Sequence, residues 1–154
     1  MKDFNLSPHF KLSEMVRSEK AIELQIDNMP RDETIINNLR IVCCRILEPV
    51  RDHFGPFTPN SGYRCSQLNQ LVRGSVTSQH TFGQAVDCEI PGVSNYDLAK
   101  WIAVNLTYDQ LILEHYTRGV PNSGWVHCSI KSGQNRMQIL TITKEGERLD
   151  GLHE

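Results

Sequence analysis

Two short segments of the sequence alternate polar and apolar side chains, and they constrain the fold more than any other feature. The segments are AVDCEI, residues 85–90, and WVHCSI, residues 125–130. Side chains alternate between the two faces of a β-strand, so each segment predicts a strand with an apolar back and a polar front. Further structure must cover the two apolar backs, because a sheet is stable only when its apolar face is buried.

Helices that can cover such a sheet are expected mainly in the first half of the chain. Apolar residues recur every three or four positions from Pro30 to His53, which predicts an amphipathic helix in which Pro49 should introduce a kink or start a new turn. Shorter helices are expected at 13–21 with Ser13 as cap, at 66–72 and at 96–104. Strands are expected at 57–64, 84–90, 108–115, 124–130 and 137–143. The predicted class is α+β, an antiparallel sheet with helices packed on one side.

Composition narrows the class of protein. The 154 residues suit one domain, 1–154, and 39% hydrophobic with 22% charged residues argues against a disordered or membrane protein. A net charge of -2 without a basic cluster disfavours a nucleic-acid partner. Five cysteines without a C-x-x-C predict free thiols in a reducing compartment. The N-terminal MKDFNLSPHFKLSE has no apolar segment, so synthesis in the cytoplasm without a signal peptide is expected. A monomer is the expected state.

The polar fronts of the two strands carry side chains that suit a metal ion. If the strands pair, Asp87 and His127 converge, and Gly83 lets the preceding loop turn tightly enough to add His80. Two histidines and one carboxylate are a common catalytic zinc set that leaves a fourth position for water. Taken singly, these residues have ordinary interpretations as a loop histidine, a turn carboxylate and a core histidine. Their combination favours a zinc site.

A zinc hydrolase also needs a proton acceptor beside its water, whose pKa zinc lowers to about 7. The nearest acidic residue before His127 is Glu114, in the otherwise apolar segment DQLILEHY. Glu114 is therefore predicted to be the general base. The alternative is an ion pair with Arg64 or Arg118. Asp109, the rival acid, is expected to be only a residue at the start of a strand.

These motifs carry a family resemblance. The pattern S-x-H-x-x-G-x-A-x-D at 78–87, then a strand glutamate and W-x-H at 125–127, resembles the LAS group of zinc peptidases. That group includes D-alanyl-D-alanine carboxypeptidases, D-Ala-D-Ala dipeptidases and phage endolysins. SGYR, residues 61–64, is similar to the family's substrate-side segment, and VHCSIK, residues 126–131, looks like the zinc strand of the Hedgehog signalling domain. The resemblance implies a Hedgehog/DD-peptidase-like zinc fold.

The resemblance implies a role for each matched residue. Zn²⁺ would be held by His80, Asp87 and His127, and Glu114 would be the catalytic base. Arg64 would contact substrate and stabilise the oxyanion, and Ser78 would contact substrate unless it serves only the turn. Many members place a histidine where this chain has Trp125, which is expected either to line the cleft or to pack in the core. Thirteen positions separate Glu114 from His127, so residues 118–124 are interpreted as a loop inserted between two strands.

The expected function is hydrolysis of a peptide bond in the stem peptide of bacterial peptidoglycan, by a zinc-dependent carboxypeptidase or endopeptidase. Family habit suggests a phage-encoded lysis enzyme that reaches the cell wall through a holin-type route or as part of a virion. The alternative is a zinc-stabilised binding or virion structural module without turnover, since zinc can supply folding energy alone. Glu114 and Arg64 favour the enzyme, because a pure binding module needs neither.

Overall fold

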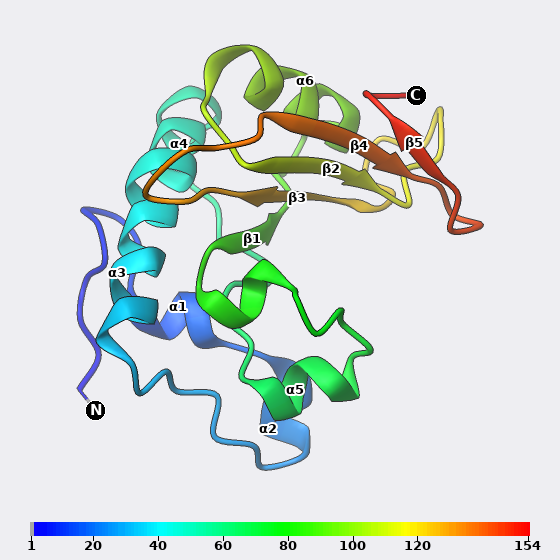
Figure 1. Ribbon diagram of the computed structural model, residues 1–154. Coiled ribbons are helices and arrows are strands. Elements are labelled where there is room, and N and C mark those ends of the chain that lie inside the picture. Colours follow the sequence, from blue (N-terminus) through cyan, green and yellow to red (C-terminus); the bar gives the residue numbers. More distant parts are fainter. Residues whose placement is uncertain (1) are drawn as a thin grey trace.

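The computed structural model describes residues 2–154 and confirms the predicted α+β class (Figure 1). Most of the helical elements lie in the first half of the chain, and four of the five strands follow α6. The helical elements are α1 (Leu12–Val16), α2 (Glu19–Glu23), α3 (Glu33–Val42), η1 (Cys43–Leu47), α4 (Glu48–Phe54), α5 (Ser66–Leu71), η2 (Gln79–Phe82) and α6 (Asn95–Asn105). The strands are β1 (Ala85–Cys88), β2 (Gln110–Glu114), β3 (Trp125–Ser129), β4 (Gln138–Ile142) and β5 (Arg148–Asp150).

The five strands form one sheet in the order β1-β3-β2-β4-β5. The β1–β3, β3–β2 and β4–β5 pairs are antiparallel, as predicted, but β4 runs parallel to β2. The connection between β3 and β4 explains the difference. β3 ends with Ser129 beside Gln110, and after a short loop β4 starts with Gln138 on the other side of Gln110. β2 and β4 therefore start at the same end of the sheet and run in the same direction. The sheet is mixed, because it contains this parallel pair beside the antiparallel ones.

The back of the sheet packs against the helices on one side, as predicted. Val86 and Cys88 of β1, Leu111 and Leu113 of β2, and Val126 and Cys128 of β3 have no exposed surface. They share one core cluster with residues of α3, η1 and α6, including Leu39, Ile46 and Ile102. All five cysteines are free thiols, as the sequence predicted. Within residues 2–154, no helix combines the length and the apolar character needed to cross a membrane.

The predicted helix at 13–21 divides into two short helices, and Ser13 does not cap it. α1 starts after Lys11, whose backbone N–H donates to the Glu14 carboxylate, while the Ser13 hydroxyl donates to Asp3. Arg17 is extended and ends α1. Ser18 then caps α2 by accepting a hydrogen bond from the Ala21 N–H, so the local capping chemistry favours a second start over a continuous helix.

The long helix predicted from Pro30 to His53 is present as the continuous run α3, η1 and α4. Asp32 caps its start by accepting a hydrogen bond from the Thr34 N–H. The π-helical turn η1 lies just before Pro49. Proline donates no backbone hydrogen bond, and a π-turn is a common way for a helix to absorb such an irregularity. The disturbance expected at Pro49 therefore takes the form of a turn with π-helical hydrogen bonds between two α-helices.

The predicted strand at 57–64 is wrong. Within the described residues this segment makes only an isolated bridge, at Ser61, to Asp87 on the outer edge of β1. Pro59 removes one of the backbone donors that a full strand would need, and Pro56 directly precedes the segment. The bridge still matters, because it holds the SGYR segment alongside the strand that carries Asp87. The sequence also gave no prediction of β5 or of the 3₁₀-helix η2.

Candidate metal centre

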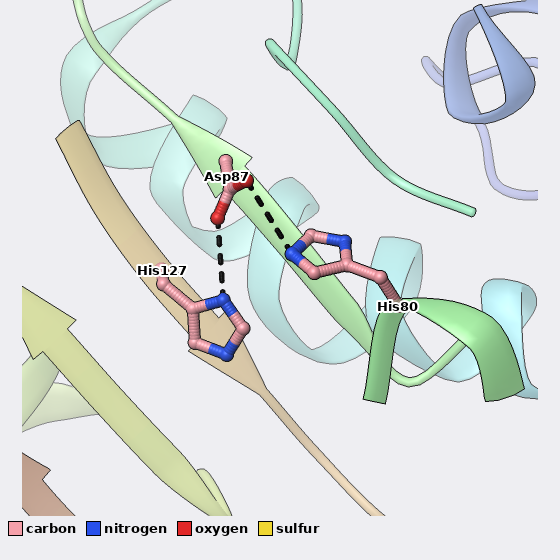
Figure 2. Close-up of side chains that lie close together, drawn as sticks. All are labelled: His80, Asp87 and His127. Atoms are coloured by element: carbon pink, nitrogen blue, oxygen red, sulfur yellow. Dashed lines mark hydrogen bonds and ion pairs between the residues drawn. The ribbon is translucent and has the colours of Figure 1, made fainter. Parts of the chain in front are cut away.

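His80, Asp87 and His127 come together on the polar front of the sheet (Figure 2). Asp87 and His127 lie directly opposite each other in the β1–β3 pair, and His80 reaches them from η2. Asp87 Oδ2 is 3.3 Å from His80 Nε2, and Asp87 Oδ1 is 3.2 Å from His127 Nδ1. The strand pairing and the short η2 therefore bring together the three residues predicted as ligands.

His80 is held by its surroundings in one orientation. The Ser78 hydroxyl accepts a hydrogen bond from the His80 N–H at the start of η2, and Gly83 ends η2 with a left-handed φ of 71°. His80 Nδ1 lies 2.6 Å from the carbonyl oxygen of Gly62. A carbonyl can only accept, so Nδ1 carries the hydrogen, and Nε2 presents its lone pair toward Asp87. This arrangement is typical of metal-binding histidines.

The donor set fits a tetrahedral Zn²⁺. Zinc bonds of about 2.0–2.2 Å to nitrogen and oxygen put neighbouring ligand atoms of a tetrahedron about 3.3 Å apart. Each Asp87 oxygen lies at about that distance from one histidine nitrogen, Oδ2 from His80 Nε2 and Oδ1 from His127 Nδ1, and one ligand atom from each residue lies within 4.8 Å of the others. Two imidazole nitrogens with one carboxylate oxygen leave a fourth position for water. The geometry thus accommodates the ion that the sequence predicts.

The ionisation states of His80 and Asp87 also suit metal binding. Burial lowers the pKa of His80, whose side chain is 3% exposed, and so favours the neutral imidazole that a metal needs. Burial opposes ionisation of Asp87, but His80 and His127 outweigh it and hold the pKa of that carboxyl well below its usual range. Asp87 is therefore a carboxylate at neutral pH.

Glu114 lies on the same face of the sheet, next to the row of metal-ligating positions. On β2 it is two residues beyond Ile112, which pairs with His127, and it pairs with Trp125. Burial raises the pKa of Glu114, and the Asp87 carboxylate adds to the rise, while His127 opposes it. Among residues 2–154, Glu114 forms no salt bridge with Arg64 or Arg118, so the ion-pair interpretation has no support.

Arg64 faces the metal centre from the SGYR segment. Its Nη2 donates to the Ser78 hydroxyl across 3.4 Å, and its buried Nε has no hydrogen-bond partner within the described part of the chain. Burial lowers the pKa of Arg64, whereas the charges of Asp87 and Glu114 raise it. A guanidinium with an unsatisfied N–H beside two carboxylates can bind a negatively charged or strongly polar group of a substrate.

A cleft of about 740 Å³ connects these side chains. Trp125 is half-buried and lines the cleft, which decides between its two predicted placements. Ser78 lines it as well, and its hydroxyl caps η2, so its role in the turn is present while its contact with substrate stays a prediction. The cleft holds every residue predicted for the site: Arg64, Ser78, His80, Asp87, Glu114, Trp125 and His127.

Sequence reasoning missed three basic residues that line the same cleft, namely Lys131, Arg136 and Arg148. Arg136 and Lys131 contact Asp109, which is fully buried beside the start of β2. Asp109 is therefore a structural carboxylate at the start of a strand, as predicted. Residues 131–137 show no alternation of polar and apolar side chains from which their position could be predicted. They reach the cleft because β4, which follows them, lies parallel to β2.

One cleft on a mixed sheet thus holds three side chains that could bind a metal ion, together with an acidic residue and an arginine, which is the set that a metal-dependent hydrolase needs. The chain belongs to the peptidase M15 family, whose model matches residues 8–129. The match covers most of the chain and every predicted site residue, and it confirms the resemblance to LAS-type zinc peptidases. Membership makes the chain a zinc-metallopeptidase relative with a peptidoglycan-type substrate. No curated protein matches the chain significantly.

Proposed function

We propose that the protein is a zinc peptidase that hydrolyses a peptide bond in the stem peptide of bacterial peptidoglycan. One observation carries the proposal: the His80–Asp87–His127 triad shares its cleft with Glu114 and Arg64. The triad alone would also suit a protein in which zinc only adds folding energy. The additional base and cation are what hydrolysis requires, and membership in the M15 family supports the substrate class.

The residues of this chain divide the chemistry among them. A Zn²⁺ held by the triad would supply Lewis acidity, which brings the pKa of a bound water to about 7 and polarises the scissile carbonyl. Glu114 accepts a proton from the attacking water and returns it to the leaving amine nitrogen. Burial raises the pKa of Glu114 toward neutral pH, and this suits a carboxyl group that must both accept a proton and return it. Arg64 donates hydrogen bonds to the oxyanion through a guanidinium already fixed beside the site.

The decisive experiment replaces the proposed base. Glu114→Ala should keep stoichiometric zinc, measured by mass spectrometry, and lose at least about 100-fold in the rate of muropeptide cleavage. Glu145→Ala is the matched control, since it removes an exposed carboxylate outside the cleft and should leave the rate unchanged. An undiminished rate in Glu114→Ala would exclude this mechanism. Mass analysis of the wild-type products identifies the bond and separates a carboxypeptidase from an endopeptidase.

The biological role extends the proposal further. We infer a phage-encoded lysis enzyme, monomeric and made in the cytoplasm, that reaches the wall through a holin-type route or with a virion. The support is the resemblance to the LAS group, which includes phage endolysins. Purified protein added to outer-membrane-permeabilised cells should clear the suspension, and absence of clearing at any dose would count against an endolysin. Bound zinc without turnover on purified peptidoglycan would instead favour the binding or virion structural module.

A further inference from the structure

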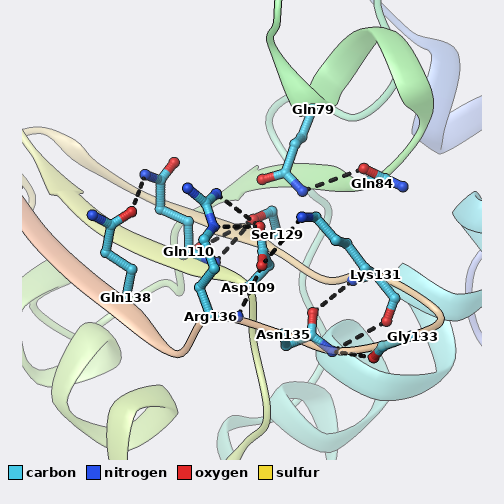
Figure 3. A network of polar contacts seen from close by, with 10 residues as sticks. All are labelled: Gln79, Gln84, Asp109, Gln110, Ser129, Lys131, Gly133, Asn135, Arg136 and Gln138. Carbon is cyan, nitrogen blue, oxygen red and sulfur yellow. Dashed lines mark hydrogen bonds and ion pairs between the residues drawn. The ribbon is translucent and has the colours of Figure 1, made fainter.

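The cleft contains a second polar cluster, away from the metal centre and next to the start of β2 (Figure 3). Its centre is Asp109, whose side chain has no exposed surface. Arg136 donates to Asp109 Oδ2 from Nε over 3.1 Å and from Nη2 over 2.7 Å. The Arg136 backbone N–H donates to Oδ1 over 3.0 Å, and Lys131 Nζ lies 3.7 Å from Oδ1. The buried carboxylate thus fixes Arg136 through three hydrogen bonds and attracts the nearby Lys131 ammonium.

The charges in this cluster do not balance. One carboxylate faces two cations, so the group keeps an excess positive charge. The side chains of Lys131 and Arg136 are 43% and 51% exposed, and both line the cleft, which the buried Asp109 does not. The hydrogen bonds to Asp109 use Nε and Nη2 of Arg136 and leave the Nη1 hydrogens for another acceptor. The excess charge therefore faces the space where a substrate lies.

The neighbours of the two cations are neutral amides. Gln79, Gln84 and Gln110 line the same part of the cleft, and Gln110 donates to Gln138 over 2.8 Å. Within the described residues, the acidic side chains that line the cleft are Asp87 and Glu114, both at the metal centre. The cluster therefore lacks a second carboxylate to neutralise it. An anionic group with hydrogen-bond acceptors is the ligand that such surroundings favour.

The spacing suits a peptide that extends from the metal centre. Asp109 precedes Ile112, the partner of His127, by three residues on the same chain. At about 3.4 Å per residue, the cluster lies roughly 10 Å from the row that carries the metal ligands. An extended peptide covers that distance in about three residues. A carboxylate within a few residues of the scissile bond would reach Lys131 and Arg136.

We propose that Lys131 and Arg136, positioned by Asp109, form a carboxylate-binding subsite that selects peptides with a free carboxylate close to the cleaved bond. The inference rests on the proposed function and gives it a chemical specificity. Stem peptides carry such carboxylates, and conversion to carboxamides removes the charge with little change in shape. The subsite would make the protein discriminate against amidated peptidoglycan.

The test measures binding, so that it does not depend on turnover. A stem tetrapeptide is prepared in two forms, with the carboxylates of its second and third residues free or converted to carboxamides. Calorimetry on zinc-loaded Glu114→Gln protein should give about 10- to 100-fold tighter binding of the free-carboxylate form. Adding Lys131→Met should reduce that ratio several-fold. Equal affinity for the two forms in the parent protein would overturn the subsite.

Two further variants guard against misfolding and general charge effects. Arg136→Met alone would leave Asp109 buried without its main partner, so it is combined with Asp109→Asn, and circular dichroism verifies folding. This double variant should bring the affinity ratio close to one. Arg118→Met removes an exposed cation outside the cleft and should retain the full ratio. An undiminished ratio in both subsite variants would exclude Lys131 and Arg136. If the wild-type protein does not cleave muropeptides, the proposed function is refuted. The affinity ratio reports on the subsite alone.

Discussion

His80 Nδ1 and the carbonyl oxygen of Gly62 are hydrogen-bonded over 2.6 Å, and this contact directs His80 Nε2 toward Asp87. Gly62 belongs to the SGYR segment, which also carries Arg64. The same short segment therefore orients one proposed metal ligand and supplies the proposed oxyanion-binding arginine. Such outer contacts set the orientation and basicity of a ligating histidine.

This relationship predicts that Gly62→Ala weakens zinc binding. A Cβ on Gly62 would lie 2.5 Å from the Met15 carbonyl oxygen, so the backbone must move and carry its carbonyl away from His80. The expected loss in zinc affinity is about 10- to 100-fold, measured by competition with a chromogenic chelator. Gly133→Ala is the control, because its Cβ would meet open space. Equal zinc affinity in both variants would show that the Gly62 contact does not orient the ligand.

Gly83→Ala is predicted to destabilise the fold around η2. Gly83 has a φ of 71°, and a Cβ there would lie 2.8 Å from the Ile35 carbonyl oxygen of α3. Backbone strain and this contact together should lower the free energy of unfolding by about 1–3 kcal/mol in urea denaturation. Gly119→Ala has a similar φ of 82° but no nearby atom, so it isolates the strain. A loss no larger than that of Gly119→Ala would mean that the approach to α3 is unimportant.

Arg64→Met is predicted to reduce turnover with little effect on zinc content. The variant removes the donors that we assign to the oxyanion, which typically costs about 100- to 1000-fold in kcat. KM should change less, because the interaction strengthens mainly in the transition state. Steady-state kinetics on muropeptides measure both constants, and Arg118→Met serves as the matched control. A rise in KM with unchanged kcat would instead make Arg64 a residue of substrate binding only.

Asp109→Asn is predicted to lower stability in a pH-dependent way. Burial raises the pKa of Asp109, but Arg136 and Lys131 outweigh it and hold that pKa below its usual value. The charged form therefore stabilises the fold above the unfolded pKa of about 3.9, and this contribution is lost as the pH falls through the folded pKa. At pH 7 the variant should lose about 2–4 kcal/mol of unfolding free energy, because the guanidinium loses its buried partner.

Urea unfolding with chelator present, at pH 7 and below pH 4, measures this effect without a contribution from bound metal. The difference between wild type and Asp109→Asn should narrow at the lower pH. Asp52→Asn, which removes an exposed carboxylate on α4, should show little difference at either pH. If Asp109→Asn loses the same amount of unfolding free energy at both pH values, the loss comes from altered packing and not from the ion pair.

Local sequence patterns predicted much of this structure. The alternation in AVDCEI and WVHCSI placed Asp87 and His127 on one face and Cys88 and Cys128 on the other, as the structure shows. The periodicity from Pro30 to His53 predicted the long helical run. Both patterns act between near neighbours, so they can be recognised without knowing which segments meet. The convergence of His80, Asp87 and His127 followed once the two strands were taken to pair.

Only the tertiary structure decided what surrounds that centre. Residues 57–64 were predicted to form a strand, but they attach to β1 by a single bridge at Ser61. The parallel placement of β4 against β2, which brings Arg136 to Asp109, depends on where a loop closes and which edge of the sheet is free. Strand neighbours are chosen by contacts between segments distant in sequence, and side-chain alternation carries no information about them. The sequence by itself therefore determined the polar faces and their chemistry, while the packing of the sheet decided how they combine into one cleft.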